Sequence, residues 1–226
     1  MRLHAEFARR AAVHAAPDAW VASPMPGVER LMLDRIGGEV ARATSLVRYA
    51  PGSAFAGHTH ACGEEYLVLE GVFQDESGDH PVGTYVRNPP GSAHVPASAP
   101  GCTIFVKLWQ FDPEDLAPLR IETGALPRVD DPLRPGVRLA PLLTRRDEAV
   151  RIEEWAPGTR APLPAPRGLE LLVLAGSLTE GGATFGLHDW LRLPPGHSGI
   201  AEAGPAGATL WVKAGHLAAI RLPPGA

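Results

Sequence analysis

Three histidines and one glutamate stand at spacings that suit a metal ion. His58 and His60 are two residues apart, and on a β-strand residues i and i+2 point to the same face, so both imidazoles can reach one ion. Gly63 permits a turn after which Glu64 can return toward them, and His94 follows thirty residues beyond Glu64. Three neutral imidazoles and one carboxylate suit a divalent first-row metal such as Fe, Mn, Ni, Cu or Zn.

Four residues near this group have two interpretations each. Tyr66 has the strand parity of Glu64, so we expect it to point toward the metal, where it either orients a substrate or packs as a core aromatic. Phe55 and Phe105 are candidate pocket residues, although core packing would also explain them. Cys62 is either a fifth ligand or redox sensor, because a thiol near a metal has a lowered pKa, or a small turn residue.

The chain repeats itself at a nearly constant offset. Four pairs of segments match in the same order: Tyr49–Ser53 with Trp155–Thr159, Glu65–Gly71 with Glu170–Gly176, Pro89–Gly91 with Pro194–Gly196, and Thr103–Lys107 with Thr209–Lys213. The sequence therefore predicts two copies of one unit of about 105 residues. The join falls near Asp112–Asp131, where X-Pro pairs such as Asp112-Pro113, Leu126-Pro127 and Asp131-Pro132 are typical of a linker.

Each copy consists of short β-rich segments separated by Gly/Pro turns. These segments are Thr44–Tyr49, Tyr66–Leu69, Thr84–Arg87 and Thr103–Phe111, then Val150–Trp155, Leu169–Leu174, Trp190–Leu193 and Thr209–Val212. Helical periodicity extends at most over Ala5–Ala16, and the segment through Trp20 could add a strand to the other copy. The pattern predicts an all-β fold of two tandem small barrels or jelly rolls. We expect an N-terminal extension (1–20), a metal-binding domain (21–118) and a second domain (119–226).

The metal-binding residues are absent from the second copy. Pro164, Pro166 and Gly199 replace the histidines, and Leu169 holds the place of Glu64. The remaining histidines of that copy, His188, His197 and His216, are predicted to be surface or turn residues. We therefore expect one metal ion per chain, and a second domain that is structural, an interaction surface or a cover for the first.

The only two lysines, Lys107 and Lys213, occupy equivalent positions in the two copies, as do Glu65 and Glu170. Both pairs are present in the copy that lacks the metal ligands, so we interpret them as structural ion pairs, Glu65–Lys107 and Glu170–Lys213. Such a pair fixes strand register even where its net stabilisation is small. The alternative is that Lys107 binds a substrate carboxylate.

Composition excludes several classes of protein. The 226 residues are 45% hydrophobic and 20% charged, which excludes a disordered chain, and 25 glycines with 24 prolines indicate many turns. With a net charge of −4 and no basic run, nucleic acid is not an expected partner. No apolar stretch approaches the roughly 18 residues of a membrane span. Two cysteines form no disulfide framework and the N-terminus lacks a signal-peptide core, so we expect a cytoplasmic protein.

The full spacing pattern resembles the two-part signature of the cupin superfamily. Residues 52–71 match its first part (Gly, five residues, His-x-His, three residues, Glu, six residues, Gly), and residues 83–94 match its second (Gly, five residues, Pro-x-Gly, two residues, His). The signature often ends with Asn where this chain has Ser98. The string from His58 to Phe73 is more narrowly similar to the ChrR-type cupin of certain anti-sigma factors. The resemblance covers both copies and implies a bicupin of jelly-roll barrels, with a metal held by His58, His60, Glu64 and His94.

The resemblance also implies two functions. ChrR-type cupins can bind zinc, and the same cupin type occurs in iron dioxygenases that cleave carbon–carbon bonds of small diketones and hydroxyketones. We expect a mononuclear metal-dependent dioxygenase with no catalytic residue beyond the metal ligands; the alternative is a zinc-binding sensor. About 20 residues without cysteine precede the first predicted strand, so the anti-sigma domain and a sigma-factor partner are not expected. We expect a small-molecule substrate and a homodimer.

Overall fold

A computed structural model describes residues 1–38, 40–145 and 148–225. The chain is all-β, as predicted, and the helical segments of the described residues are three 3-10 turns: η1 (Pro17–Ala19), η2 (Thr123–Ala125) and η3 (His216–Ala218). None of these is long and apolar enough to span a bilayer. The chain forms two compact units. The first comprises Met1–Ala5, Ala16–Gly124 and Arg221–Ala226, and the second comprises Glu6–Ala15 and Ala125–Ile220.

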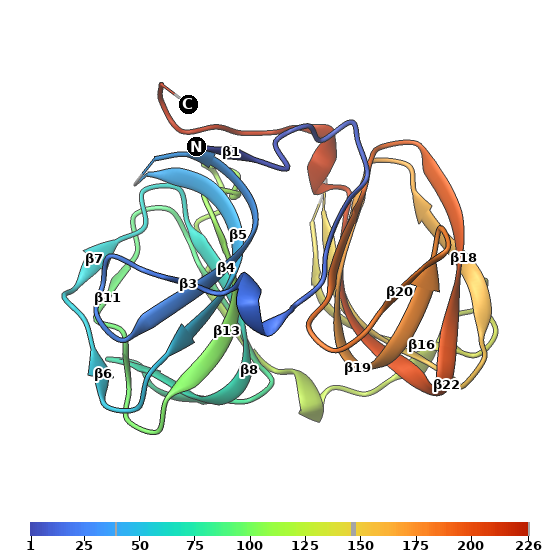
Figure 1. Cartoon of the computed structure of the whole chain (residues 1–226), viewed down its shortest axis with the longest axis horizontal. Coiled ribbons are helices and arrows are strands. Elements are labelled where there is room, and N and C mark those ends of the chain that lie inside the picture. Colours follow the sequence, from blue (N-terminus) through green and yellow to red (C-terminus); the bar gives the residue numbers. More distant parts are fainter. Residues whose placement is uncertain (39, 146–147, 226) are drawn as a thin grey trace. The chain divides into compact units, whose positions relative to one another are not determined.

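The first unit is a curled antiparallel sheet (Figure 1). Its main path runs β1-β4-β5-β13-β8-β10-β14. The strands are β1 (Arg2–Leu3), β3 (Val21–Ala22), β4 (Val28–Gly37), β5 (Ala41–Tyr49), β6 (Ser53–Ala54), β7 (His58–Thr59), β8 (Glu64–Asp75), β9 (Gly78–Pro81), β10 (Thr84–Asn88), β11 (Ala93–His94), β12 (Ala97–Ser98), β13 (Cys102–Leu108) and β14 (Leu119–Glu122). β7 and β11 form a separate two-stranded sheet, which carries two of the predicted ligands.

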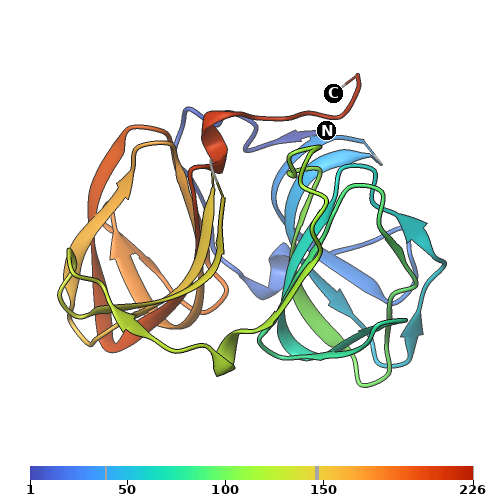
Figure 2. The same ribbon diagram turned by 180° about the vertical axis from the view of Figure 1, so that it is seen from behind.

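The second unit is also a curled antiparallel sheet, seen from behind in Figure 2. Its main path runs β15-β16-β17-β22-β19-β21-β2. The strands are β2 (Ala11–Val13), β15 (Val129–Asp130), β16 (Val137–Thr144), β17 (Ala149–Trp155), β18 (Arg160–Ala165), β19 (Leu169–Glu180), β20 (Ala183–Phe185), β21 (Trp190–Leu193) and β22 (His197–Ala214). β2 comes from the N-terminal segment, so the periodicity over Ala5–Ala16 marks an added strand and not a helix.

The repeat in the sequence corresponds to a repeat in backbone geometry. Gly71 in β8 and Gly176 in β19 have φ of +67° and +69°, and a Cβ at these positions would lie 1.9 and 2.1 Å from the carbonyl oxygens of Gly101 and Gly207, respectively. Only glycine tolerates both the left-handed backbone and this close approach. The adjacent ladders, β8–β13 and β19–β22, each shift register just before the glycine. A bulge and a glycine at the same place in both units explain why this segment recurs.

The boundary between the units differs from the predicted one at 118/119. The division follows Gly124, because β14 pairs with β10 along Thr84↔Glu122 to Arg87↔Leu119 and so belongs to the first unit. The N-terminal extension is likewise divided between the units, since Glu6–Ala15 belongs to the second. X-Pro pairs marked a connecting region, but they could not indicate which sheet its short strands join.

The two lysines lie directly opposite their predicted glutamates. Strand register pairs Lys107 with Glu65, and Lys213 with Glu170, and all four side chains are buried. Lys107 Nζ donates to Thr44 Oγ1 at 2.9 Å, and Lys213 Nζ lies 3.1 Å from Glu148. Glu65 accepts hydrogen bonds from Tyr85 (2.8 Å) and Arg87 (2.9 Å). The cross-strand placement fits the structural interpretation, and the ion pairs themselves remain a prediction.

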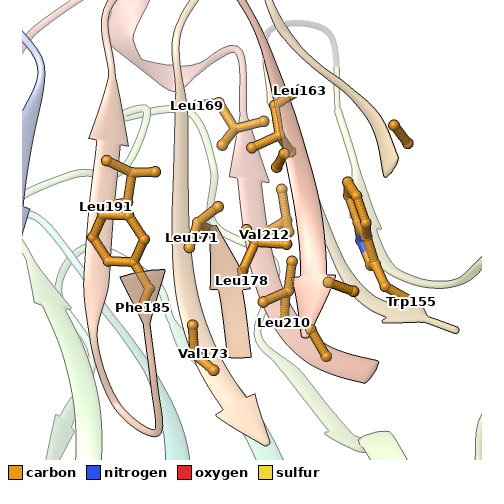
Figure 3. Close-up of a cluster of buried hydrophobic side chains, with 14 of the residues drawn as sticks. Trp155, Leu163, Leu169, Leu171, Val173, Leu178, Phe185, Leu191, Leu210 and Val212 are labelled. Carbon is orange, nitrogen blue, oxygen red and sulfur yellow. The ribbon is translucent and has the colours of Figure 1, made fainter. Parts of the chain in front are cut away.

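The second unit has an apolar interior (Figure 3). Leu163, Leu169, Leu171, Leu210 and Val212 belong to one buried cluster, and each is fully excluded from solvent. At the position that matches Glu64 of the first unit, Leu169 therefore carries packed hydrocarbon, whereas Pro164 and Pro166, which match His58 and His60, are exposed. Such burial contributes roughly 1.5–3 kcal/mol for each large aliphatic side chain.

His216 of the second unit lies in a turn, as predicted, but its side chain is buried. The side chain of His216 is only 5% exposed, and its Nε2 lies 2.7 Å from Glu170 Oε2. We predicted a surface or turn residue, and the 3-10 turn η3 does contain it. The turn directs the imidazole inward, where it satisfies a buried carboxylate that would otherwise be costly to desolvate.

Candidate metal centre

A two-stranded ladder brings two of the predicted ligands together. β7 and β11 pair antiparallel with His58 directly opposite His94. The backbone of His60 extends this pairing, because its N–H donates to the Ser92 carbonyl and its carbonyl accepts from Gly91 N–H, both at 2.8 Å. The second half of the motif is therefore fixed to the first by backbone hydrogen bonds, which a search for side-chain spacing does not reveal.

Glu64 enters the site from the first position of β8. Gly63 makes the predicted turn with φ of +76°, and a Cβ there would lie 2.5 Å from the Phe111 ring. Glu64 Oε2 lies 3.3 Å from His60 Nε2 and 3.7 Å from His94 Nε2. Asn88, its neighbour on β10, donates to the same oxygen at 3.1 Å. The carboxylate is thus held among the imidazoles by a strand, a turn and an amide.

The three imidazoles face one another around a common point. Their ring centroids are 4.8 to 4.9 Å apart in each pairing, with interplanar angles of 75° or 76°. One nitrogen from each of His58, His60 and His94 lies within 4.8 Å of the others, the only such group of potential metal ligands in the described residues. This arrangement presents three ring nitrogens to one ion from three directions.

The residues fit a bound metal ion. His60 is 7% exposed, and its Nε2 has no hydrogen-bond partner among the described residues. A buried polar atom without a partner costs free energy, and a metal ion between this nitrogen and Glu64 would remove that cost. Burial lowers the pKa of His60 to about 3 and also lowers the pKa of His58. Both imidazoles are therefore neutral at pH 7, which is the form that binds a metal.

The other two ligands respond differently to the same burial. Burial raises the pKa of Glu64, because the ionised carboxylate loses its hydration. For His94, burial acts to lower the pKa, but contact with Asp75 and the charge of Glu64 outweigh it and the pKa is raised. A cation bound between them would favour the ionised carboxylate and the neutral imidazole.

Asp75 supports His94 from the side away from Glu64. Its Oδ2 lies 3.5 Å from His94 Nδ1, and its Oδ1 lies 3.0 Å from His80 Nε2 and 2.6 Å from Ser77 Oγ. The side chain of Asp75 is 8% exposed. Because Nδ1 faces this carboxylate, Nε2 of His94 is directed to the ligand group. A carboxylate behind a ligating histidine orients the ring and raises its basicity.

We expect Asp75→Asn to weaken metal binding by roughly 10- to 100-fold, the range typical of such outer partners. The amide keeps the size of the side chain but removes the charge that orients His94. The measurement is a competition titration of zinc against a chromogenic chelator. The matched control is Asp79→Asn. Asp79 is exposed and accepts a hydrogen bond from Gln74 on the neighbouring strand β8. Equal zinc affinity in both variants would show that Asp75 does not support the ligand.

A cavity of about 360 Å³ opens onto the ligand group. His58, His60 and Glu64 line it, so these ligands face open space and are not enclosed by protein. The rest of the wall is largely apolar, with Val28, Val47, Tyr49, Phe55, Ile104, Val106 and Leu108 among its residues. A cavity of this kind, with few polar groups beside a metal site, is typical of small-molecule binding.

The predicted pocket residues have three different positions. Phe55 lines the cavity, with its ring 5.2 Å from that of Tyr49. Tyr66 is buried on the same side of the sheet, in a cluster with Phe73, and is not among the residues lining the cavity. Ile104 and Val106, the residues before and after Phe105 in β13, both line the cavity, so the Phe105 side chain lies on the opposite face of the strand. On that face its ring centroid is 5.8 Å from Lys107 Nζ. This buried position agrees with the core-packing interpretation of Phe105, because one residue of parity decides the face.

Cys62 lies in the turn between β7 and β8 and is half-buried. It is not part of the group of potential ligands. This position agrees with the interpretation of Cys62 as a turn residue. Its proposed role as a fifth ligand or redox sensor receives no support from the described geometry.

Several residues of the site were not predicted. Asn88 precedes the Pro-Pro-Gly turn, Asp75 ends β8, and Arg30 and Tyr49 enter the cavity from β4 and β5. Asn88 lies opposite Glu64 in the β8–β10 ladder, so an aligned hairpin would have indicated it. Arg30 lies outside the motif, and no local spacing connects it to the histidines.

The fold and the site together resemble those of a cupin: a curled antiparallel sheet with a His-x-His pair, a glutamate and a third histidine brought together. More narrowly, residues 8–112 match the family model of the ChrR cupin-like domain. This agrees with the family resemblance seen in the sequence. No curated protein sequence matches the chain significantly.

Solved structures of low identity share the fold. A presumed dioxygenase from Nostoc punctiforme has a TM-score of 0.70 at 14% identity, covering 100% of this chain and 86% of its own. A presumed glyoxylate-induced protein from Pseudomonas aeruginosa has a TM-score of 0.71 at 14% identity, covering 95% and 90%. A cupin 2 conserved barrel domain protein from Leptotrichia buccalis has a TM-score of 0.59 at 12% identity, covering 86% and 91%.

Proposed function

We propose that the protein is a mononuclear metal-dependent dioxygenase of the bicupin type, acting on a small oxygenated molecule such as a diketone or hydroxyketone. The metal would be held by His58, His60, Glu64 and His94, with one ion per chain. The second unit would be a cupin without a metal site. Similarity to a presumed dioxygenase over the full length of this chain supports the two-cupin arrangement.

The observation that carries the proposal is the cavity at the ligand group. Structural zinc sites are closed by four protein ligands, whereas catalytic sites keep a position open to water or substrate. Three of the four proposed ligands line a cavity large enough for a molecule of a few carbon and oxygen atoms. When bound, iron would supply activation of a chelating substrate and of O2.

The chain's own residues would bind and shield the substrate. Phe55, Ile104 and Val106 exclude water from the apolar part of a diketone. Burial, together with the charge of Glu64, raises the pKa of Tyr49 well above its usual value, so its hydroxyl remains protonated and can donate to a substrate oxygen. Among the described residues that line the cavity, the only carboxylate is Glu64. No acid–base pair separate from the ligands is needed for chemistry that the metal performs.

The test is oxygen uptake by iron-loaded protein with 2,4-pentanedione as the probe. We expect O2 consumption that requires both iron and the diketone, with one O2 used for each diketone cleaved. Zinc-loaded wild type and His58→Ala exposed to the same iron are the controls, and neither should consume O2. Absence of uptake by fully iron-loaded wild type with both diketone and hydroxyketone probes would contradict the proposal.

A second candidate function is a zinc-binding sensor or regulatory module. The match of residues 8–112 to the ChrR cupin-like domain supports it. Purified protein that retains about one zinc per chain, together with no iron-dependent O2 uptake, would favour this candidate over the enzyme.

A further inference from the structure

Arg30 is a cation in the wall of the cavity, and its side chain has no partner within the part of the chain that the structure describes. It lies on β4, directly opposite Val47 of β5 and two residues from Val28, and all three line the cavity. Arg30 is half-buried, and its guanidinium makes no hydrogen bond or ion pair with any other described residue. A partly buried guanidinium among aliphatic side chains has five donors and no acceptor, which is costly unless a ligand supplies one.

The charges around Arg30 favour an anion. Among the described residues that line the cavity, Glu64 is the only acidic one, and it belongs to the proposed metal ligands. A second arginine, Arg35, also lines the cavity and donates to the Gly38 carbonyl. With a divalent ion bound, the formal charges of the described residues and the ion in this wall would sum to a positive value. An apolar cavity with a positive net charge attracts a small anion.

Tyr49 lines the same cavity as Arg30 and the proposed metal ligand Glu64. Burial and the charge of Glu64 raise the pKa of Tyr49, and the charge of Arg30 acts in the opposite direction. Val28 and Tyr49 are cross-strand neighbours at one end of the β4–β5 ladder, and Arg30 follows two residues along. The cavity therefore presents, in one continuous wall, a guanidinium, a phenolic hydroxyl and the ligand group.

We propose that Arg30 binds a carboxylate of the substrate, so that the preferred diketone or hydroxyketone is one that also carries a carboxylate, as a small oxo acid or hydroxy acid does. This inference deepens the proposed function and rests on it for the metal. The oxygen atoms at the other end of the molecule would face His58, His60 and Glu64, and Tyr49 would donate to an oxygen between them. The planar guanidinium suits a carboxylate because it can form two parallel hydrogen bonds with it.

Two probes that differ only in the carboxylate test this role: 2,4-dioxopentanoate and 2,4-pentanedione. Binding of each to zinc-loaded protein is measured by calorimetry, so that no O2 chemistry is involved. We expect the wild type to bind the dioxo acid at least about tenfold more tightly than the neutral diketone, since hydrogen bonds to charged groups are the stronger ones. Arg30→Gln should remove this preference and change diketone binding by less than about twofold.

Two further variants separate a specific role from a general effect of charge. Arg30→Lys should restore part of the preference, because it keeps the charge but loses the bidentate geometry. Arg48→Gln is the matched control, since Arg48 is on the adjacent strand, half-exposed and paired with the exposed Glu29. The Arg48→Gln variant should prefer the dioxo acid to the same degree as the wild type. Zinc content and circular dichroism of each variant verify that site and fold are intact.

The outcomes distinguish this inference from the proposed function. Equal binding of both probes, with no effect of Arg30→Gln, would overturn the role of Arg30 even if iron-loaded protein consumed O2. An Arg30-dependent preference without any O2 uptake would support the anion site and contradict the dioxygenase. Failure of both probes to bind zinc-loaded wild type would overturn the inference.

Discussion

His58→Ala should remove the metal from the protein almost completely. The wild type, purified without a tag and in the presence of metal, should contain about one divalent ion per chain. His58 is exposed and supplies one of the three imidazoles, so its loss should weaken binding by more than the 10- to 100-fold typical of an outer partner. Because the side chain is not in the core, the fold should be retained. Metal content by plasma mass spectrometry measures the effect.

His14→Ala is the control for this prediction. His14 is an exposed histidine of the second unit that pairs with Asp189 at 2.8 Å. The His14→Ala variant should retain the wild-type metal content. Two ions per chain in the wild type would contradict the single-site assignment, and an unchanged content in His58→Ala would contradict the ligand group itself.

Leu169→Glu should destabilise the second unit by about 3 kcal/mol or more, because it places a carboxyl group in an apolar interior. Leu169 holds the place that Glu64 has in the first unit, and it is fully buried. Glu64 lies opposite Asn88, which donates to it, whereas Leu169 lies opposite Leu193. The new carboxyl group would therefore lack the amide donor that the first unit provides.

Chemical denaturation followed by circular dichroism measures this effect. Leu169→Met keeps the volume and should cost less than about 1.5 kcal/mol. The reciprocal change, Glu64→Leu, should leave the metal-free protein as stable as the wild type, since replacing a buried charge by a packed side chain is often neutral or favourable. A small effect of Leu169→Glu would mean that the interior of the second unit admits water or a cation.

The sequence by itself determined the ligand group and its loss in the second copy. The reason is that each half of the motif is local: the parity of one strand sets His58 and His60, a glycine turn sets Glu64, and a second short segment carries His94. The repeat also determined that two similar units exist, because the same glycine and bulge recur in each. These features require only a few adjacent residues, and their spacing remains visible in the linear chain.

Only the tertiary structure decided which distant residues meet that group. Asp75 reaches His94 from the far end of β8, and Arg30 enters the cavity from β4, a strand that precedes the motif. Phe105 is turned away from the cavity by a single residue of register, and Ala11–Val13 adds a strand to the second unit. Each depends on which strand pairs with which, and in which register. That choice is made by the burial of whole sheet faces, so no local spacing in the sequence records it.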